Sequence, residues 1–575
     1  MDVSPLVRRL GLAAPVLAVL GACSALLVGF PAPPGLGGHD ADIAIAWLGQ
    51  VTAALADGDP WPRWLPQAAF GFGSPAFYIY PPLLYWVGGL VGLATGLGPD
   101  LALRLTLALV ALAGGGAMLL LLRREGCPDR AARTLAALYL VFPYAAFIDP
   151  IHRGAAAECA ALAALPVVGL ALRLPPARPA AIAGLGAAFA LLILTHLPMA
   201  VLMAGLGVVH YLLRWRGWRA LAVFAAGQAL AAALGAPVLV PALSLQGLIS
   251  PEYWTLWPGW RPSTWLLFQD PTHLRPGGHL LYYACFALLL LLAGQVIALR
   301  RWARAGWGGA DLPPLLAGLL ALALTTPLTK PAWDYLPILP LVQIPLRAFG
   351  PASLFLVLAL GRRLAAGAAR PGRVLLLGLL PSAAMTAALL LAVTLLPERG
   401  PRGGYRFLPS EARAAAAMAS PGGHPPEYIP RWAHAADWAE IGVRQVAPPA
   451  AVQGLPAVVQ GEGRVAERRT GATYRLEIDC ATACRVLARQ FWWPAFVLEG
   501  LPGAPTLDPA TGMAAVEAPA GRHLVAFRRR WLPSEWIGLG AFAAGLAVLA
   551  VLAWPRRAIA PVAGGAGLRT RIPAP

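Results

Sequence analysis

Residues 101–133 read LALRLTLALVALAGGGAMLLLLRREGCPDRAAR, an apolar run followed at once by a cluster of arginines. A helix of about 20 apolar residues can cross the hydrocarbon core of a bilayer, and the run from Leu101 to Leu122 has that length. Arginines in short loops mark the cytoplasmic side of a membrane protein. This stretch therefore predicts a membrane-spanning helix that ends in the cytoplasm.

The composition of the whole chain is also that of a membrane protein. Hydrophobic residues make up 58% of the 575 residues, charged residues only 13%, and the mean hydropathy is +0.64. This apolar content excludes a disordered chain, and the sequence has neither a collagen nor a coiled-coil period. The net charge of +18 comes almost wholly from arginines, many of them in short clusters. We interpret them as topology signals and expect no nucleic-acid partner.

Twelve apolar runs are long enough, within a few residues, to span a membrane as helices. They are residues 10–30, 101–122, 131–148, 155–174, 179–195, 197–213, 219–243, 280–299, 312–328, 347–361, 373–396 and 535–554. A shorter run from Pro82 to Leu97 would divide the arginine clusters between the two sides if it crossed. We therefore expect it to lie along the membrane surface, with both termini of the chain in the cytoplasm.

The remaining segments define the expected domains. Residues 397–534 have the only sustained polar composition, and the segments YRLEID and RVLARQFWW within them are rich in strand-forming residues. We expect a transmembrane domain over residues 1–396 and a small, mostly β, sandwich-like domain outside the membrane over residues 397–534. Residues 535–554 would form the last helix and residues 555–575 a cytoplasmic tail.

Two cysteines flank a turn in the expected outer domain. Cys480 and Cys484 enclose the sequence CATAC. Outside the cytoplasm, an oxidising compartment permits a disulfide between them, whereas a C-x3-C spacing alone is weak support for a metal site. The pair is a disulfide candidate.

The first outer loop begins GGHDADIAIAW and carries two aspartates close to a membrane boundary. Apolar residues at helical spacing follow from Ile43 to Leu55, so Asp40 and Asp42 should lie at the N-cap and in the first turn of a helix. Capping needs only one aspartate, and here there are two together with His39. Ionisable groups at such a position also indicate a binding or catalytic site.

A second outer turn, FIDPIHRGAAAECAAL, joins two expected spans. Asp149, Arg153 and Glu158 lie in it, and an uninterrupted apolar run follows Glu158. We expect Glu158 to face a partner or a cavity rather than lipid, because a charged group in the hydrocarbon is costly. The simpler alternative is an Arg153–Glu158 ion pair that locks the turn, and the pair could have both roles.

Other polar residues lie at outer helix ends. His196 ends the run of residues 179–195, and Lys330, Gln343 and Arg347 lie in the last outer turn before the run of residues 347–361. Lys330 and Arg347 are the outer cations best placed to meet a phosphate at the level of the lipid headgroups.

The order of several motifs resembles the GT-C superfamily of integral-membrane glycosyltransferases. An acidic pair after the first span is followed by an amphipathic helix, PRW, a GFGSP turn and YPPLLYW. More closely, the set GHD, GFGSPAFYIYPPLLYW, RGAAAE, LLILTHLP, LVQIPLRAFG and EYIPRW resembles the bacterial membrane family labelled 6-pyruvoyl-tetrahydropterin synthase-related, which neighbours the YfhO-like proteins. The label does not indicate the activity, because a pterin synthase needs a zinc-binding histidine cluster, whereas the nine histidines here are scattered.

The superfamily resemblance implies transfer of a sugar from a polyprenyl-phosphate donor. The acceptor would be a lipid or glycan of the cell envelope, and the reaction would take place among membrane lipids at the outer face of the bacterial inner membrane. Asp40, or alternatively Asp42, would orient or deprotonate the acceptor, with Asp149 or Glu158 as a second acid. The expected substrate- and phosphate-binding residues are His39, Arg153, His196, Lys330, Gln343 and Arg347. No cofactor is fixed by the resemblance, but Asp40 and Glu158 could hold a divalent cation such as Mg or Mn.

Two other classes of function stay open. A transporter or flippase for lipid or polysaccharide would favour inverted repeats and helices broken near the midplane of the membrane. The sequence has no convincing repeat, and its polar residues cluster at the outer helix ends. A non-catalytic scaffold for envelope assembly could instead use the outer domain to bind a partner. The glycosyltransferase is the leading hypothesis.

Overall fold

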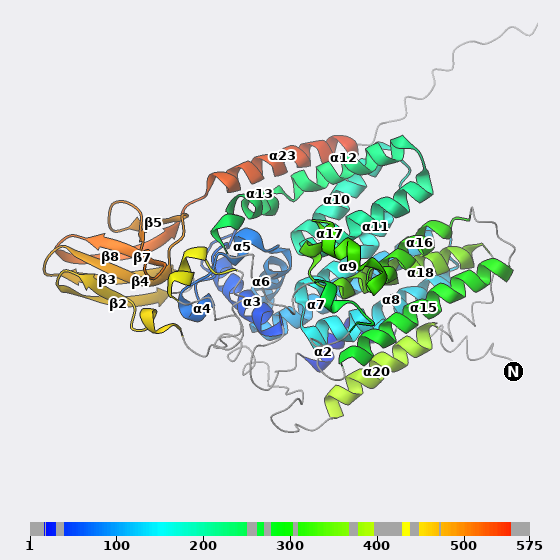
Figure 1. Ribbon diagram of the computed structural model, residues 1–575, viewed down its shortest axis with the longest axis horizontal. Coiled ribbons are helices and arrows are strands. Elements are labelled where there is room, and N and C mark those ends of the chain that lie inside the picture. Colours follow the sequence, from blue (N-terminus) through cyan, green and yellow to red (C-terminus); the bar gives the residue numbers. More distant parts are fainter. Residues whose placement is uncertain are drawn as a thin grey trace, which may run out of the picture.

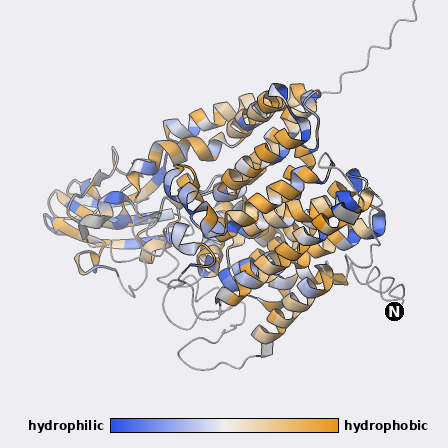
Figure 2. Ribbon diagram, turned by 45° about the vertical axis from the view of Figure 1, so that its right-hand side comes forward, coloured by the Kyte–Doolittle hydropathy of each residue, from blue (hydrophilic) through white to orange (hydrophobic). Residues whose placement is uncertain are grey.

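Long apolar helices form the body of the protein, and two β-sheets lie at one end of it (Figure 1). The computed structural model describes residues 16–17, 19–29, 40–249, 262–269, 278–302, 309–366, 378–395, 428–436, 448–470 and 473–553. Hydrophobic residues dominate the long helices, whereas hydrophilic residues gather at helix ends and on the sheets (Figure 2).

Six helical segments of the described residues are long and apolar enough to cross a membrane. They are Pro99–Arg124 (α7), Asp129–Arg153 (α8, Asp129–Val141, with the π-helix η1, Tyr144–Arg153), Leu197–Trp215 (α11), Leu280–Arg300 (within α15, Gly278–Trp302), Pro345–Ala365 (η7, Pro345–Ala348, with α18, Phe349–Ala365) and Pro533–Ala553 (α23). Shorter apolar helices are α6 (Leu83–Thr95), α9 (Ala156–Leu172), α10 (Pro179–Thr195) and α20 (Leu380–Leu395).

Two of the expected spans are bent pairs of helices. Residues 219–243 fall on α12 (Trp218–Leu234) and α13 (Ala236–Leu245), which continues into η2 (Gln246–Leu248), and the two parts meet at 76°. Helix α16 (Leu312–Ala323) is followed at 90° by η5 (Pro327–Thr329) and α17 (Lys330–Tyr335). Pro237 and Pro327 lie in the first turns after the breaks, where proline can begin a helix but not continue one. Twelve separate spans are therefore not established, and most of residues 10–30 lie outside the described residues.

Small residues allow the helices of the body to pack closely. A Cβ atom at Gly114 of α7 would lie 2.6 Å from the carbonyl oxygen of Ala163 in α9. Such close backbone approach is typical of helix contacts in membranes. Helix α18 lies deepest, since its residues from Phe349 to Leu364 are all buried. A helix that is covered on every side has no polar face, which explains its nearly continuous apolar sequence.

The segment after the first span folds as expected. Helix α3 (Asp40–Ala56) is followed by the short helices α4 (Ala68–Gly71) and α5 (Ala76–Ile79) and then by α6. Helix α6 has 13 residues, or about 20 Å, whereas a bilayer core is about 30 Å thick. It is shorter than a straight helix that spans this core, and its position along the membrane surface stays a prediction.

The expected β-sandwich is present between residues 457 and 529. One sheet has the order β1 (Ala457–Gln460), β4 (Cys484–Phe491), β7 (Met513–Ala518), β6 (Thr506–Leu507), and the other β2 (Gly463–Thr470), β3 (Thr473–Cys480), β8 (Gly521–Arg529), β5 (Phe496–Glu499), all antiparallel. Leu476 and Val525 from one sheet and Val486 and Val516 from the other are fully buried in a shared core. The Cys480–Cys484 disulfide is confirmed and joins β3 to β4. Residues 397–427, 437–447 and 554–575 lie outside the described residues.

Backbone hydrogen bonds attach the sandwich to the first outer segment. Arg469 donates to the carbonyl oxygens of Pro66 (2.9 Å) and Gly71 (2.6 Å), and Arg489 donates to that of Phe70 (2.9 Å). The sandwich core continues without a break into the core of α3 and α6. The sandwich is thus packed against the segment that carries Asp40.

A buried ionic group joins this segment to α13 and α23. The side chain of Arg63 is only 1% exposed, and its guanidinium donates to the carbonyl oxygens of Phe77 and Pro237. Its Nε atom lies 3.6 Å from Oε1 of Glu535, at the start of α23, and Arg529 of β8 donates to the same oxygen at 2.9 Å. Burial lowers the pKa of Arg63 to about 10, so it still carries its charge at neutral pH and needs Glu535 as a partner.

Substitution of Glu535 by Ala should destabilise the protein, because it leaves the buried Arg63 without its counter-charge. Loss of one partner from a buried pair costs about 3–5 kcal/mol, which we expect as a clearly lower Tm of the full-length protein in detergent. Asp479→Ala is the matched control, since Asp479 pairs with Arg522 at the exposed surface and such pairs contribute about 0–1 kcal/mol. Equal, small losses in both variants would contradict a structural role for the Arg63 group.

Candidate active site

Glu158, in the first turn of α9, is the centre of a buried hydrogen-bonded cluster. It is 1% exposed. The hydroxyl of Tyr144 donates to Oε1 at 2.6 Å, while Arg153 Nη1 and Arg347 Nε each donate to Oε2 at 2.9 Å. Two cations and a hydroxyl therefore compensate one carboxylate, which makes a charge at the end of an apolar helix tolerable. The predicted Arg153–Glu158 ion pair is confirmed.

An unusual helix brings two of these partners together. Tyr144 and Arg153 both lie in η1, a π-helix of 10 residues with Pro150 inside it. Proline has no N–H to continue α-helical bonding, and π-helical turns often occur at functional sites. Arg153 Nη1 also donates to Oδ1 of Asp149 at 2.6 Å, and Asp149 is fully buried. The buried carboxylates of Asp149 and Glu158 thus fix the position of the Arg153 guanidinium.

Arg347 reaches Glu158 from the turn before α18. Its Nη1 donates to the carbonyl oxygen of Val342 at 2.5 Å and to Oε1 of Gln343 at 3.1 Å. Gln343 has φ 65° and ψ −55° and lies at the centre of a γ-turn closed by the hydrogen bond from Ile344 N–H to the carbonyl oxygen of Val342, a rare and strained geometry. Gln343 therefore helps to orient Arg347, and its binding of substrate stays a prediction.

His196 completes the inner part of the cluster. It is 5% exposed and caps α11, with Nδ1 accepting a hydrogen bond from the backbone N–H of Met199 at 3.3 Å. Since Nδ1 is the acceptor, we assign the ring proton to Nε2. The ring interacts electrostatically with Glu158 and Arg347.

Asp40 interacts with this cluster through its charge. It is the first residue of α3 and is exposed, yet it interacts electrostatically with Arg153, Arg347 and Glu158. Although the residue is exposed, desolvation of its carboxyl group by nearby protein raises the pKa of Asp40, and the charges of Arg153 and Arg347 lower it in part. The charge of Asp40 is thus coupled to two cations that Glu158 holds in place.

Gly154 is what lets α3 approach the π-helix. It has a φ of 70°, and a Cβ atom placed on it would lie 2.5 Å from Cβ and 2.6 Å from the backbone nitrogen of Ala41. The turn after Arg153 therefore touches the first turn of α3 directly. The two outer segments that carry the predicted acids meet at this contact.

The other predicted residues take different positions. Asp42 is buried at 8% exposed, so Asp40 is the accessible member of the acidic pair. Lys330 is exposed and pairs with Asp334 in its own helix, and its contact with a phosphate stays a prediction. His39 lies outside the described residues.

Aromatic residues near Asp40 were not among the predicted site residues. Tyr80 and Tyr85 interact electrostatically with Asp40. Trp47 packs edge-on against Tyr80 with ring centroids 5.1 Å apart, and Tyr80 lies 5.9 Å from Tyr428 in the same way. The motifs YPPLLYW and EYIPRW contained these tyrosines, and their aromatic content was the signal that could have identified them.

The arrangement does not fit the expected metal site. Both oxygens of Glu158 already accept hydrogen bonds from Tyr144, Arg153 and Arg347, and two neighbouring cations repel a metal ion. Within the described part of the chain, no group of three or more His, Cys, Asp or Glu side chains is placed to bind one. We therefore derive no step through a metal.

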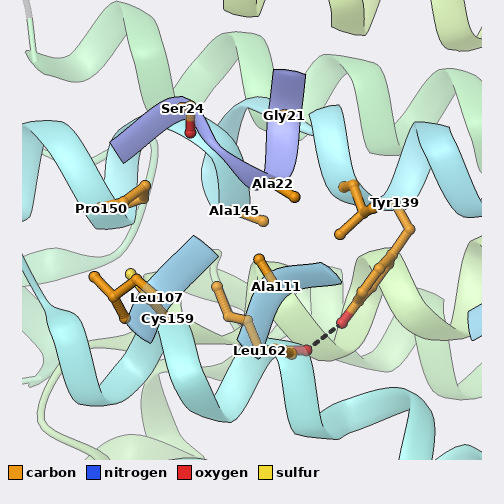
Figure 3. A pocket seen from close by; sticks show the side chains of 12 residues that line it. Gly21, Ala22, Ser24, Leu107, Ala111, Tyr139, Ala145, Pro150, Cys159 and Leu162 are labelled. Carbon is orange, nitrogen blue, oxygen red and sulfur yellow. Dashed lines mark hydrogen bonds between the residues drawn. The ribbon is translucent and has the colours of Figure 1, made fainter. Parts of the chain in front are cut away.

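A small cavity lies elsewhere, between the first described helical residues, α7, α8, η1 and α9 (Figure 3). Its volume is about 40 Å³, and its lining is mostly apolar: Gly21, Ala22, Ser24, Leu107, Ala111, Tyr139, Leu140, Ala145, Pro150, Cys159, Leu162 and Ala163. This space suffices for a few water molecules but not for a sugar. The candidate site is the accessible surface around Asp40 instead.

The fold and the cluster define a polytopic membrane protein with an acidic and basic site at one end of its helices. A family model described as "6-pyruvoyl-tetrahydropterin synthase related domain; membrane protein" matches residues 77–396, more than half of the chain. The chain belongs to this family of membrane proteins. The matched region contains Glu158, Arg153 and Arg347 but not Asp40.

Comparisons with curated proteins and with solved structures do not define the function further. No curated protein matches the sequence. Among solved structures, the chain is similar to the arabinofuranosyltransferase AftD from mycobacteria, with 21% sequence identity and a TM-score of 0.39. The alignment covers 72% of this chain and 29% of that protein, so the chain spans less than a third of the length of AftD.

Substitution of Gly154 by Ala tests the contact that places Asp40. The new methyl group would collide with Ala41 and require a left-handed alanine, which should cost about 1–3 kcal/mol and lower the Tm. Gly205→Ala in α11 is the control, because its Cβ would meet no atom within 4 Å, and stability should stay the same or rise slightly. A Gly154→Ala protein as stable as the control would show that the contact is not tight.

Proposed function

We propose that this protein is a membrane glycosyltransferase of the GT-C type. It transfers a sugar from a polyprenyl-phosphate donor to a lipid or glycan acceptor of the cell envelope. The single observation that supports this best is the exposed Asp40, whose carboxylate interacts electrostatically with the guanidinium groups of Arg153 and Arg347. Transfer from a lipid phosphate needs a base for the acceptor and cations for the leaving group, close together and within reach of the membrane.

The unused donors of the two arginines fit a phosphate. Within the described residues, Arg153 makes hydrogen bonds only through Nη1, and Arg347 only through Nε and Nη1. Both side chains are partly accessible, at 11% and 9%. Each can therefore hold Glu158 with one side of its guanidinium and offer N–H groups to a phosphate with the other. Glu158 and Asp149 act as positioning residues in this proposal.

The chemistry assigns one role to each group. The acceptor hydroxyl attacks C1 of the donor sugar, and its proton passes to the carboxylate of Asp40. The bond between C1 and the phosphate oxygen breaks, and the polyprenyl phosphate leaves with the electron pair. Arg153 and Arg347 stabilise the charge that develops on this phosphate. A single displacement of this kind inverts the configuration at C1.

The position of the site supports a lipid-linked donor. The cluster lies at the N-terminal ends of α9, α11 and α18, whereas arginines lie at the C-terminal ends of the same helices. The positive-inside rule makes the arginine-rich end cytoplasmic, so the site and the β-sandwich face outward from the inner membrane. Nucleotide sugars are absent there, whereas a polyprenyl-phosphate sugar can enter from the bilayer.

Asp40→Asn should abolish sugar transfer while the protein accumulates normally. Loss of a general base lowers the rate by about 10²- to 10⁴-fold, and an exposed side chain contributes little to stability. The measurement is transfer of label from radiolabelled polyprenyl-phosphate sugars to endogenous acceptors in isolated membranes, with the protein level followed by immunoblot. Asp57→Asn, at the exposed end of α3, is the matched control and should keep full activity.

The same experiment separates the alternatives. If transfer depends on the protein but persists in Asp40→Asn, another residue is the base. A different outcome is that the protein has no effect on transfer but changes the amount of lipid-linked sugar on one face of the membrane. That result would identify a flippase or transporter rather than a glycosyltransferase. For a scaffold, neither the sugar transfer nor the distribution of lipid-linked sugar would change in Asp40→Asn.

The pH dependence of transfer should report the pKa of Asp40. The base works only when it is deprotonated, so activity falls as the pH drops through this pKa. Because burial raises the pKa of Asp40 above 3.8, the acidic limb should lie above pH ~4. Arg347→Gln removes a charge that lowers this pKa and should move the limb to higher pH, whereas Arg347→Lys should move it less. An acidic limb that is the same in all three proteins would exclude Asp40 as the titrating base.

A further inference from the structure

Four helix ends meet at Glu125, away from the candidate active site. Glu125 ends α7, Arg173 ends α9, and Arg214 and Arg362 lie in the last turns of α11 and α18. Arg214 Nη1 and Arg173 Nε approach Oε1 of Glu125 at 3.0 and 3.6 Å, and Arg362 Nε approaches Oε2 at 2.9 Å. One carboxylate is thus shared by three guanidinium groups.

The charges in this cluster do not balance. Arg362 is 3% exposed, donates through Nε to Glu125 and through Nη1 to the carbonyl oxygen of Ala310 at 2.7 Å, and its charge compensates that of Glu125. Arg173 and Arg214 converge on an oxygen of a carboxylate that is already compensated, and they repel each other. Their side chains are 28% and 20% exposed. The excess positive charge of Arg173 and Arg214 would therefore attract an additional anion.

Both arginines keep donors for such an anion. Nε of Arg173 is buried and faces Glu125, and Nη2 donates to the carbonyl oxygen of Arg124. Its Nη1 makes no hydrogen bond among the described residues. Arg214 uses only Nη1, for Glu125, in the same part of the chain. The helix C-termini add partial negative charge, which favours arginines there but provides no full counter-charge.

Neighbouring acids are already paired with other arginines. Asp129 binds Arg123 and Arg133. Asp311 similarly accepts a hydrogen bond from Arg300 at 2.6 Å and lies 3.9 Å from Arg363. Neither acid is shared with Arg173 or Arg214.

The surroundings of the two arginines are those of a membrane boundary. Leu213, Trp218 and Leu221 next to Arg214 are exposed at 39%, 81% and 51%. Large apolar side chains with this exposure face lipid in a membrane protein, and tryptophan favours the interface. An anion bound here would lie at the level of the lipid headgroups.

We propose that Arg173 and Arg214, braced by Glu125, bind the phosphate of an anionic membrane lipid. A phosphodiester has two non-bridging oxygens that guanidinium groups can bind together, and basic pockets between helix ends are typical headgroup sites. The site is separate from Asp40 and does not rest on the proposed glycosyltransferase activity. The bound lipid would tie the ends of α7, α9, α11 and α18 to one another.

The test uses the full-length protein in nanodiscs of phosphatidylcholine, with or without phosphatidylglycerol. A ligand that binds only the folded state stabilises it, so the Tm of the natural protein should rise by a few degrees when phosphatidylglycerol is present. Arg173→Gln/Arg214→Gln should lose most of this rise. The matched control is Arg178→Gln/Arg219→Gln, which removes the same charge from exposed positions at the starts of the following helices α10 and α12 and should keep the rise.

Arg173→Gln alone serves if the double variant does not fold, because Arg173 makes the weakest contact with Glu125. An equal rise in the natural protein and in the variant that lacks Arg173 would overturn the proposal. A third arm adds inorganic phosphate to nanodiscs of phosphatidylcholine alone. If this reproduces the rise, a soluble phosphate compound occupies the site and the lipid assignment is wrong.

Discussion

The negative charge of Glu158 is the constraint on which the candidate site depends. A carboxylate at the end of an apolar helix is tolerated only when cations and hydrogen-bond donors compensate it. Arg153, Arg347 and Tyr144 do so from two different parts of the chain. The compensation fixes both arginines, and the turn after Arg153 in turn sets the position of α3 through Gly154. The location of Asp40 thus depends on how the charge of Glu158 is compensated.

The β-sandwich is connected to the same arrangement. It packs on the segment between α3 and α6 through Arg469 and Arg489, and Glu535 pairs with the buried Arg63 where β8 leads into α23. These contacts hold Asp40, the aromatic residues around it and the sandwich as one packed unit. A substrate that reaches Asp40 will therefore meet aromatic faces as well as charges, which suits a sugar ring.

Much of the fold could be predicted from the sequence because it depends on local patterns. Within the described residues, the apolar runs lie on helices, and the helix after Asp40, the short helix near Pro82 and the strands YRLEID and RVLARQFWW lie where spacing and composition placed them. The bends at Gly235 and before Pro327 were missed, since hydropathy measures length but not direction. In the site, the meeting of Glu158 with Arg153 was expected from proximity in the chain. The meeting with Arg347 and the burial of Asp42 depend on tertiary packing, whereas the pair of Lys330 with Asp334 is local to one helix.

The most direct measurement of the central claim is a mass comparison of envelope lipids and glycans from cells with and without this protein. A glycosyltransferase predicts that one lipid or glycan species loses the mass of a pentose or hexose when the protein is absent and regains it on complementation. Identical mass profiles in both cells, with the protein shown to be expressed in one of them, would contradict the account.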